Sequence, residues 1–284
     1  MIKVKNVAVL GAGTMGNGIA QVLAQAGFQV VMADLEDKFL QRGFESINKS
    51  LGMMKDKGKI TEEHADKVLA RIRGSLDLKE AVSEVDLVIE AIPEDINLKQ
   101  QIFKQLDEVC PGHTILATNT STISITAIAS ATRRPDKVVG MHFSPPVPVM
   151  RGVELIKGLH TSEETMEVAR TVVEMMGKEY YVSRDAPGFI GNRLLTLFVN
   201  EAFNVLWEGI ASAEDIDKGI RLSLGHPMGP LELADFTGLD VLMGALEYMH
   251  KEMGDKYRPS PLLKQLVAAG YYGRKTGRGV YNYS

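Results

Sequence analysis

His142 and Glu154 are the residues whose types and spacing are best suited to chemistry. His142 ends the apolar run 138–142, and Glu154 lies 12 residues later in a second apolar run, beyond a proline-rich segment. A strand–loop–strand return could bring the two side chains together. A carboxylate that accepts from one imidazole nitrogen would fix the tautomer and make the other nitrogen a better base. Such a base suits the oxidation of an alcohol. The alternative is a histidine satisfied in the core and a glutamate on the surface of a strand.

A glycine-rich turn near the N-terminus predicts a dinucleotide site. It follows the apolar run 7–10 in the order G-x-G-x-x-G, and its residues are Gly11, Gly13, Thr14, Met15 and Gly16. These glycines allow a tight turn, the approach of a pyrophosphate and close helix packing, while the N–H groups of the helix start bind phosphate. Asp34 lies just after the next apolar run, 28–32. Its carboxylate would accept from ribose hydroxyls and repel a 2′-phosphate, which favours NAD over NADP.

Strand and helix patterns alternate over the first two-thirds of the chain. Apolar runs typical of buried strands occupy 7–10, 28–32, 85–91, 114–117, 138–142, 152–156 and 180–182. The long charged stretch 38–73 is typical of a helical hairpin with a break at 56–59. This order predicts an α/β domain over 1–184, with a doubly wound sheet that carries the hairpin as an insertion.

Only helical patterns follow residue 185. They occupy 190–209, 213–223, 230–253 and 261–269, and the segment 183–191 is typical of a linker because it contains Pro187 and Gly188. We therefore predict an all-α second domain over 185–284.

Composition narrows the function classes further. Hydrophobic residues make up 45% of the chain and charged residues 24%, which is typical of a globular protein. The net charge of -4 shows no basic excess, and this disfavours nucleic-acid binding. The single cysteine excludes an internal disulfide, and the histidines lack metal-ligand spacing, so we expect no metal site. The apolar stretches are far shorter than the roughly 18 residues of a membrane span, and we expect a cytoplasmic protein.

Eight motifs give the chain a more specific likeness. They are EAIPED at 90–95, NTST at 119–122, GMHF at 140–143, PVPVM at 146–150, VELI at 153–156, PGFIGNRLL at 187–195, GHPMGPLELADFTGLD at 225–240 and KTGRGVY at 275–281. With these motifs the chain resembles the L-3-hydroxyacyl-CoA dehydrogenases, in particular the short bacterial 3-hydroxybutyryl-CoA dehydrogenases. The resemblance implies a Rossmann-type domain, a helical domain that forms a homodimer, and NAD-dependent interconversion of a short L-3-hydroxyacyl-CoA and its 3-oxoacyl-CoA.

The resemblance also assigns residues to the site. It implies that His142 is the general base, that Glu154 orients it, and that Ser121 and Asn192 complete the catalytic set. The residues implied to contact NAD, besides the glycine loop and Asp34, are Ala91, Glu94, Lys99, Ser121 and Lys275. Those implied to contact the acyl-CoA are Ser50, Lys57, Ser121 and Asn192. Lys57 is chemically sensible because coenzyme A carries phosphates and because Lys55 and Lys59 add to a local positive cluster.

Simpler interpretations stay open for several of these residues. Ser121 also fits a helix cap, and Asn192 fits a residue at a helix start. Glu94 could be an acid favoured by a helix dipole, Lys99 could lie on a solvated helix face, and Lys57 could belong to an exposed charged turn.

The chain departs from the family's pattern beside His142. The family commonly reads H-F-F-N-P, whereas this chain has Ser144 and Pro145 before Pro146, so that a proline without amide or N–H replaces the asparagine. Gly152 also stands where a larger apolar residue is common. We expect an altered acyl pocket or cofactor geometry and an intact base. The alternative functions are a dehydrogenase of a non-thioester 3-hydroxy acid or polyol, and a non-catalytic NAD-binding protein.

Overall fold

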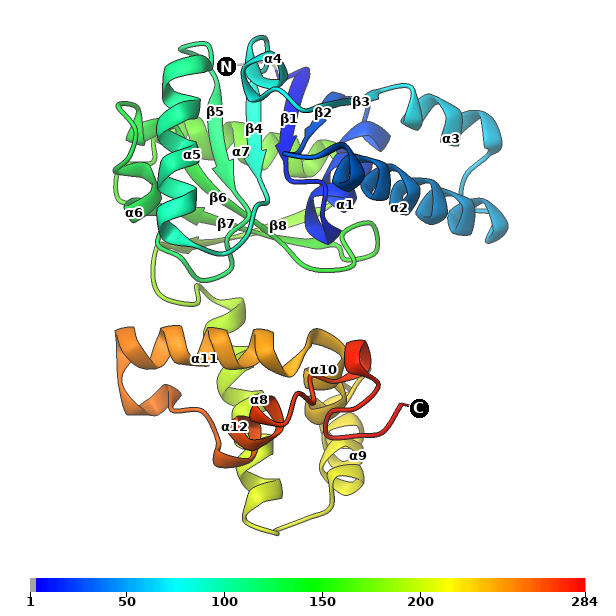
Figure 1. Ribbon diagram of the computed structural model, residues 1–284, viewed down its shortest axis with the longest axis vertical. Coiled ribbons are helices and arrows are strands. Elements are labelled where there is room, and N and C mark those ends of the chain that lie inside the picture. The colour runs from blue at the N-terminus through cyan, green and yellow to red at the C-terminus, as the bar shows by residue number, and fades with distance from the viewer. Residues whose placement is uncertain (1–3, 284) are drawn as a thin grey trace. The chain divides into compact units, whose positions relative to one another are not determined.

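The computed structural model describes residues 4–283, and the chain divides into two compact units, Met1–Asp185 and Ala186–Ser284 (Figure 1). The first unit is built on one sheet in the order β3-β2-β1-β4-β5-β6-β7-β8. Its strands are β1 (Asn6–Leu10), β2 (Gln29–Ala33), β3 (Ile72–Ser75), β4 (Leu87–Glu90), β5 (Ile115–Thr118), β6 (Val138–Phe143), β7 (Gly152–Lys157) and β8 (Glu179–Arg184). Neighbours from β3 to β6 pair in parallel, β7 is antiparallel to β6, and β8 is parallel to β7.

Helices cover both faces of this sheet. The helices α1 (Thr14–Gln25) and α7 (Glu163–Met175) lie on one face, and α5 (Ile96–Val109) and α6 (Ile125–Ala129) lie on the other (Figure 1). Short elements α4 (Leu78–Val82) and η1 (Pro135–Lys137) complete the unit. The strand order reverses between β1 and β4, and sheets of this kind bind ligands beyond the strand ends at that point. The predicted α/β fold with a doubly wound sheet is confirmed.

The inserted hairpin is shorter than the sequence suggests. It consists of α2 (Asp37–Asp56) and α3 (Glu62–Leu69), whereas the predicted range extended to residue 73. The prediction is wrong at its end, because Ile72–Ser75 forms the edge strand β3 beside β2. Only Ile72 and Ser75 are buried in that strand, so its sequence carries no apolar run that would have revealed it.

The second unit consists mainly of helices around its own core. They are α8 (Gly191–Trp207), α9 (Ala213–Leu224), α10 (Pro230–Thr237), α11 (Leu239–Met253), α12 (Pro261–Ala268), η2 (Asp255–Tyr257) and η3 (Arg274–Thr276). Fully buried side chains such as Phe203, Leu246 and Tyr257 form the core. The prediction of one helix over 230–253 is wrong. Gly238 has a φ of 108°, which a right-handed helix cannot accommodate, so α10 ends there and α11 begins.

Candidate active site

The loop between β1 and α1 contains three glycines. Close packing leaves no room for a side chain at two of them, whereas the third has open space that a ligand could occupy. A Cβ atom on Gly11 would lie 2.6 Å from the Ala91 carbonyl oxygen, and one on Gly16 would lie 1.8 Å from the Gly11 carbonyl oxygen. A Cβ atom on Gly13 would meet nothing within 4 Å, and Gly13 has an ordinary φ of -64°. The open space over Gly13 fits the close approach of a pyrophosphate to the backbone. Thr14 and Met15 then begin α1, whose N-terminus faces that space.

Asp34 is held against this loop. It follows β2, and its Oδ2 accepts a hydrogen bond from the Ala12 N–H at 2.7 Å while its Oδ1 accepts from the Leu35 N–H at 2.7 Å. The carboxylate is partly exposed, so it keeps acceptor capacity toward a ligand. Its position beside the loop fits the predicted contact with a ribose.

A buried ion pair orders the segment after β4. Lys99, on α5, is 1% exposed, and its Nζ donates to Glu90 Oε1 at 2.7 Å. Glu90 is fully buried and also accepts from the Thr118 hydroxyl at 2.7 Å and from the Ile92 N–H at 2.8 Å. The interpretation of Lys99 as part of a solvated face is therefore wrong. Glu90 was not among the residues predicted from the sequence, although an acid at the end of an apolar run is a usable signal.

Glu94 positions the loop that carries Ser121. Its Oε1 accepts from the Thr120 hydroxyl at 2.5 Å, from the Ser121 N–H at 2.9 Å and from the Thr122 N–H at 3.2 Å, and its other oxygen lies 3.3 Å from Lys99 Nζ. Burial favours the neutral acid, but the charge of Lys99 and these hydrogen bonds outweigh it and lower the pKa of Glu94. Ser124, not Ser121, caps α6. A role for Glu94 and Lys99 in direct cofactor contact stays a prediction.

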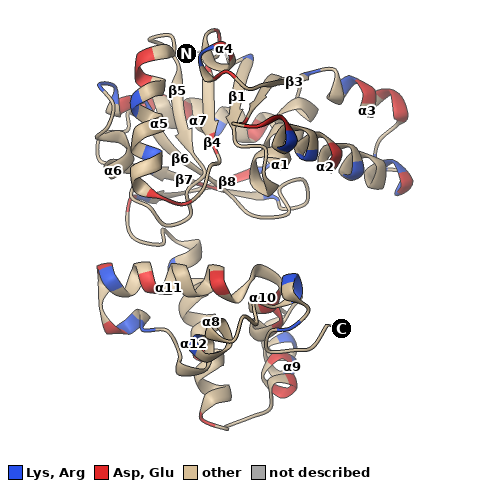
Figure 2. Cartoon of the chain, in the orientation of Figure 1, with Lys and Arg blue, Asp and Glu red and all other residues tan. Residues whose placement is uncertain are grey.

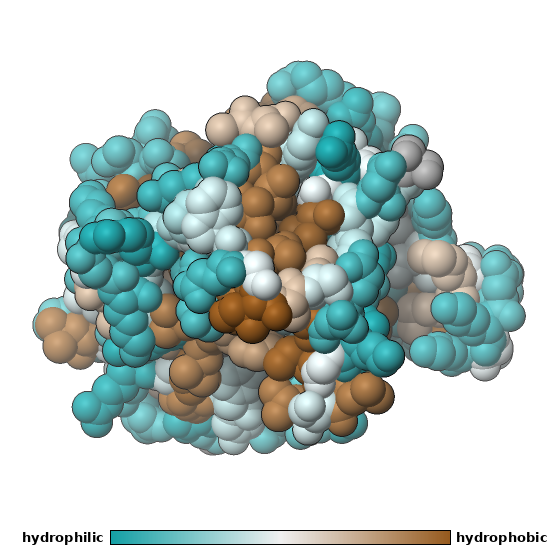
Figure 3. All heavy atoms as spheres, turned by 90° about the horizontal axis from the view of Figure 1, so that it is seen from below, coloured by the Kyte–Doolittle hydropathy of each residue, from teal (hydrophilic) through white to brown (hydrophobic). Residues whose placement is uncertain are grey.

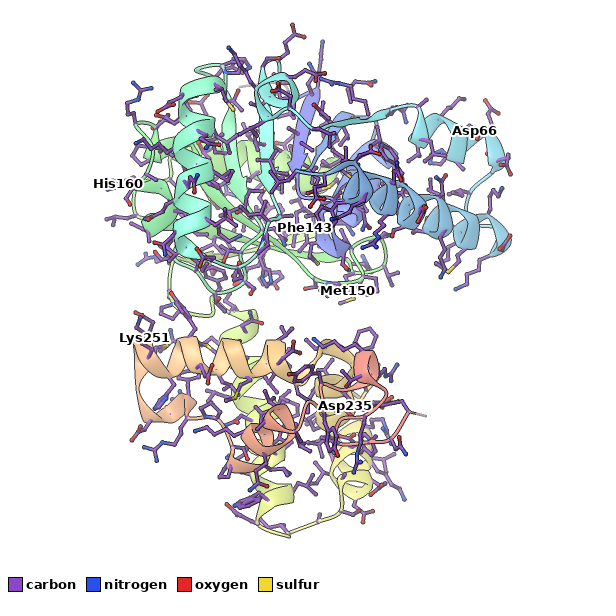
Figure 4. All side chains as sticks on the ribbon, in the orientation of Figure 1. Asp66, Phe143, Met150, His160, Asp235 and Lys251 are labelled. Atoms are coloured by element: carbon purple, nitrogen blue, oxygen red, sulfur yellow. The ribbon has the colours of Figure 1, made fainter. Side chains whose placement is uncertain are left out.

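His142 and Glu154 lie side by side. They are register partners on the antiparallel strands β6 and β7, and His142 Nδ1 is 3.6 Å from Glu154 Oε2. Glu154 is fully buried, whereas 15% of the His142 side chain is exposed. The end of β6 is tied to the Ser121 loop because the Phe143 N–H donates to Asn119 Oδ1 at 2.9 Å; Phe143 is labelled in Figure 4. The pair can therefore act as an oriented base beside that loop.

Lys178 anchors the segment that follows β6. Its Nζ donates to the carbonyl oxygens of Val147 at 2.7 Å and Met150 at 2.5 Å; Met150 is labelled in Figure 4. Burial lowers the pKa of Lys178. Val147 packs against α1, because a Cβ atom on Gly18 would lie 2.9 Å from its own. Lys178 was not predicted from the sequence, because no local pattern marks a lysine whose partners lie about 30 residues away.

The hairpin carries the residues implied to bind coenzyme A. Ser50 lies in α2, and Lys57 caps its C-terminal end and is exposed. Blue and red segments alternate along α2 and α3 in Figure 2. Lys55 forms an ion pair with Glu62, so the positive cluster is weaker than three lysines suggest. Lys57 and Lys59 stay exposed.

The remaining candidates lie in the second unit. Asn192 is the second residue of α8, and its carbonyl oxygen accepts from the Thr196 hydroxyl. Lys275 lies in η3, where its Nζ donates to Asp240 Oδ2 at 2.6 Å. Within residues 4–283, no cluster of three or more His, Cys, Asp or Glu side chains could hold a metal ion. Over the same residues no helix combines the length and apolarity needed to cross a membrane.

Comparison with known proteins adds the family. Residues 6–186 match the model of the 3-hydroxyacyl-CoA dehydrogenase NAD binding domain, and residues 188–283 match that of the 3-hydroxyacyl-CoA dehydrogenase C-terminal domain. The chain belongs to the 3-hydroxyacyl-CoA dehydrogenase family. The resemblance seen in the sequence is thus confirmed, as are the enzyme class and NAD as the cofactor.

Individual members are similar over nearly their whole length. A probable 3-hydroxybutyryl-CoA dehydrogenase of Bacillus subtilis is 48% identical over 99% of this chain and 98% of its own. The human mitochondrial hydroxyacyl-coenzyme A dehydrogenase is 42% identical over 99% of this chain and 92% of its own. The crystal structure of (S)-3-hydroxybutyryl-CoA dehydrogenase from Ralstonia eutropha has a TM-score of 0.95 and 47% identity, and covers 99% of this chain and 100% of that one.

Hydrogen bonds fix the segment after β6 in which we predicted a departure from the family's pattern. The Pro146 carbonyl oxygen accepts from the N–H groups of Val149 and Met150 at 2.9 and 3.0 Å, and Lys178 binds the same turn. The turn beyond Ser144 and Pro145 is therefore ordered by hydrogen bonds within its backbone and from the Lys178 side chain.

Proposed function

We propose that this protein interconverts a short L-3-hydroxyacyl-CoA and the corresponding 3-oxoacyl-CoA with NAD, and that His142 is the general base. The observation that carries the proposal is the His142–Glu154 pair at the end of β6, next to the loop of Ser121, in a chain of this family. The open space above Gly13 and the carboxylate of Asp34 would hold the dinucleotide, together with Ala91, Glu94, Lys99 and Lys275.

The protein's own residues handle the proton. Bound NAD supplies the acceptor for the hydride that leaves C3 of the substrate. Because Nδ1 of His142 is directed at the Glu154 carboxylate, Nε2 is the ring nitrogen that takes the proton of the substrate hydroxyl. Glu154 stabilises the resulting imidazolium. In the reverse direction Nε2 returns the proton to the forming alcohol.

Ser121 and Asn192 would position the substrate. Glu94 holds the backbone and hydroxyl of Ser121, so the serine is presented in one geometry, which favours orientation of the reacting oxygen. We propose that the Asn192 amide donates to the thioester carbonyl. Ser50 and Lys57 on the hairpin would bind coenzyme A, with Lys57 supplying a charge for its phosphates. The names of the bacterial relatives support a short acyl chain.

The test compares acetoacetyl-CoA with free acetoacetate as oxidants of NADH, followed by NADH absorbance. Rapid oxidation by the thioester alone is the expected result. Equal rates with both compounds would favour the alternative, a dehydrogenase of non-thioester 3-hydroxy acids. No turnover with either compound, with NADH binding intact by fluorescence, would contradict catalysis and favour a non-catalytic NAD-binding protein.

We also propose a cytoplasmic homodimer formed through the second unit. Several large apolar side chains of that unit are exposed, among them Leu194, Ile210, Leu222 and Leu224. Hydrophobic residues gather on the face of this unit that is seen from below in Figure 3. The buried single cysteine, Cys110, is compatible with a reducing compartment. Light scattering of the purified protein tests the dimer, and a monomer would contradict it. Fractionation of the source cells tests the cytoplasmic location, and a membrane-bound pool would contradict it.

A further inference from the structure

Three neighbouring strands place a tyrosine in line with the His142–Glu154 pair. Glu154 on β7 is the register partner of His142 on β6 and of Tyr181 on β8. Side chains of paired residues project from the same face of a sheet. This is the face covered by α6, because a Cβ atom on Gly140, two residues before His142, would contact Ile125 of that helix. Tyr180, the preceding residue, packs instead into the core on the α1 and α7 side.

The ring of Tyr181 occupies space that Gly152 leaves open. A Cβ atom on Gly152 would lie 3.4 Å from Tyr181 Cε1, which is ordinary van der Waals contact. Gly152 begins β7 and lies two residues before Glu154, on the same face. The ring therefore extends along β7 toward the end of the sheet at which β6 ends with His142 and Phe143.

Tyr181 is accessible and neutral. It is 42% exposed, so the ring borders space that the rest of the described chain does not fill. Burial and the nearby charge of Glu154 raise the pKa of Tyr181, so it presents an uncharged ring at neutral pH. An uncharged aromatic surface of this kind suits contact with an apolar group.

The sheet order indicates which part of the substrate lies on this side. In the first unit, the residues proposed to bind NAD follow β1, β2, β4 and β5, and the hairpin proposed to bind coenzyme A follows β2. His142 is on β6, and in the sheet formed by the described residues β7 and β8 lie beyond it. The reacting C3 carbon bears two carbon substituents. If the thioester arm runs toward the hairpin, the acyl arm runs toward β7 and β8.

We propose that Tyr181, packed over Gly152, forms the wall that ends the acyl subsite and restricts the substrate to short chains. This inference rests on the proposed function. It also assigns a role to Gly152: residues 152 and 181 border the same space, and the ring of Tyr181 fills it. Tyr181 is thus a specificity-determining residue that takes no part in the proton transfer.

The experiment measures kcat/KM for 3-oxooctanoyl-CoA relative to acetoacetyl-CoA. We expect Tyr181→Val to raise this ratio at least about tenfold, because it opens room for methylene groups, each of which is worth about tenfold or more in an apolar pocket. Tyr181→Phe keeps the ring and should leave the ratio unchanged. The matched control is Val182→Ala, which alters a residue of the same strand that is also 42% exposed but projects from the opposite face. The double variant Gly152→Leu/Tyr181→Val refills the space and should restore the wild-type ratio.

The outcomes separate this inference from the proposed function. A wild-type enzyme without activity on either thioester refutes both. An active wild type with an unchanged ratio in Tyr181→Val refutes the wall alone, as does an equal change in Val182→Ala. A change in Tyr181→Phe as large as in Tyr181→Val would assign the effect to the hydroxyl and also refute the wall. Tyr181→Leu repeats the test if circular dichroism shows that the valine variant is unfolded.

Discussion

Replacing Glu154 with glutamine removes the charge beside His142 while keeping the size of the side chain. Glu154 Oε2 lies 3.6 Å from His142 Nδ1, and the carboxylate is fully buried, so bulk water does not screen the pair. At an effective dielectric constant near 20, a unit charge at this distance stabilises an imidazolium by about 4.6 kcal/mol. If roughly half of the positive charge has formed in the transition state, Glu154→Gln loses about 2.3 kcal/mol of transition-state stabilisation, or about 50-fold in rate. If the charge has formed fully, the rate falls about 2000-fold.

Steady-state kinetics with L-3-hydroxybutyryl-CoA and NAD, the direction in which His142 takes up the proton, measure this loss in kcat/KM. The control is Glu179→Gln, which removes the same charge from the neighbouring strand β8, where the carboxylate is exposed and paired with Arg151. Because an exposed charge is screened, this variant should lose far less activity. Circular dichroism and NADH fluorescence establish that both variants fold and bind cofactor. A loss in Glu154→Gln no larger than in Glu179→Gln would refute the assignment of Glu154 as the group that stabilises the protonated base.

Three further predictions concern the network, the cofactor and the thioester. Lys99→Met leaves the fully buried Glu90 carboxylate without its ammonium partner and should lower the free energy of unfolding by about 3–5 kcal/mol, as measured by denaturant titration. Adding Glu90→Gln should recover most of this stability, and a further loss would contradict the role of the pair. Asp34→Ser removes the carboxylate predicted to bind the ribose. The ratio of kcat/KM for NADH to kcat/KM for NADPH should fall about tenfold or more. An unchanged ratio would show that Asp34 does not face the ribose. Lys57→Ala should raise KM for acetoacetyl-CoA more than it lowers kcat, and a fall in kcat at constant KM would argue against contact with coenzyme A.

The sequence was most informative where function depends on local order. The glycine loop, its helix and Asp34 follow one another within a single βαβ unit, so their spacing alone predicts a dinucleotide site. It was less informative where an element has no pattern of its own. The edge strand β3 has only two buried residues, Ile72 and Ser75, and the break between α10 and α11 depends on the positive φ of Gly238.

The sequence by itself therefore determined the fold class and the family, and it predicted the residues of the cofactor loop and the base. Only the tertiary structure decided what supports them. Glu90 and Lys99 form a buried pair, Lys178 binds the turn after β6, and Tyr181 fills the space over Gly152. These contacts join segments from 9 to 31 residues apart. The strand contacts also depend on register, because a shift of one residue would send a side chain to the opposite face of the sheet, and no local pattern encodes that choice.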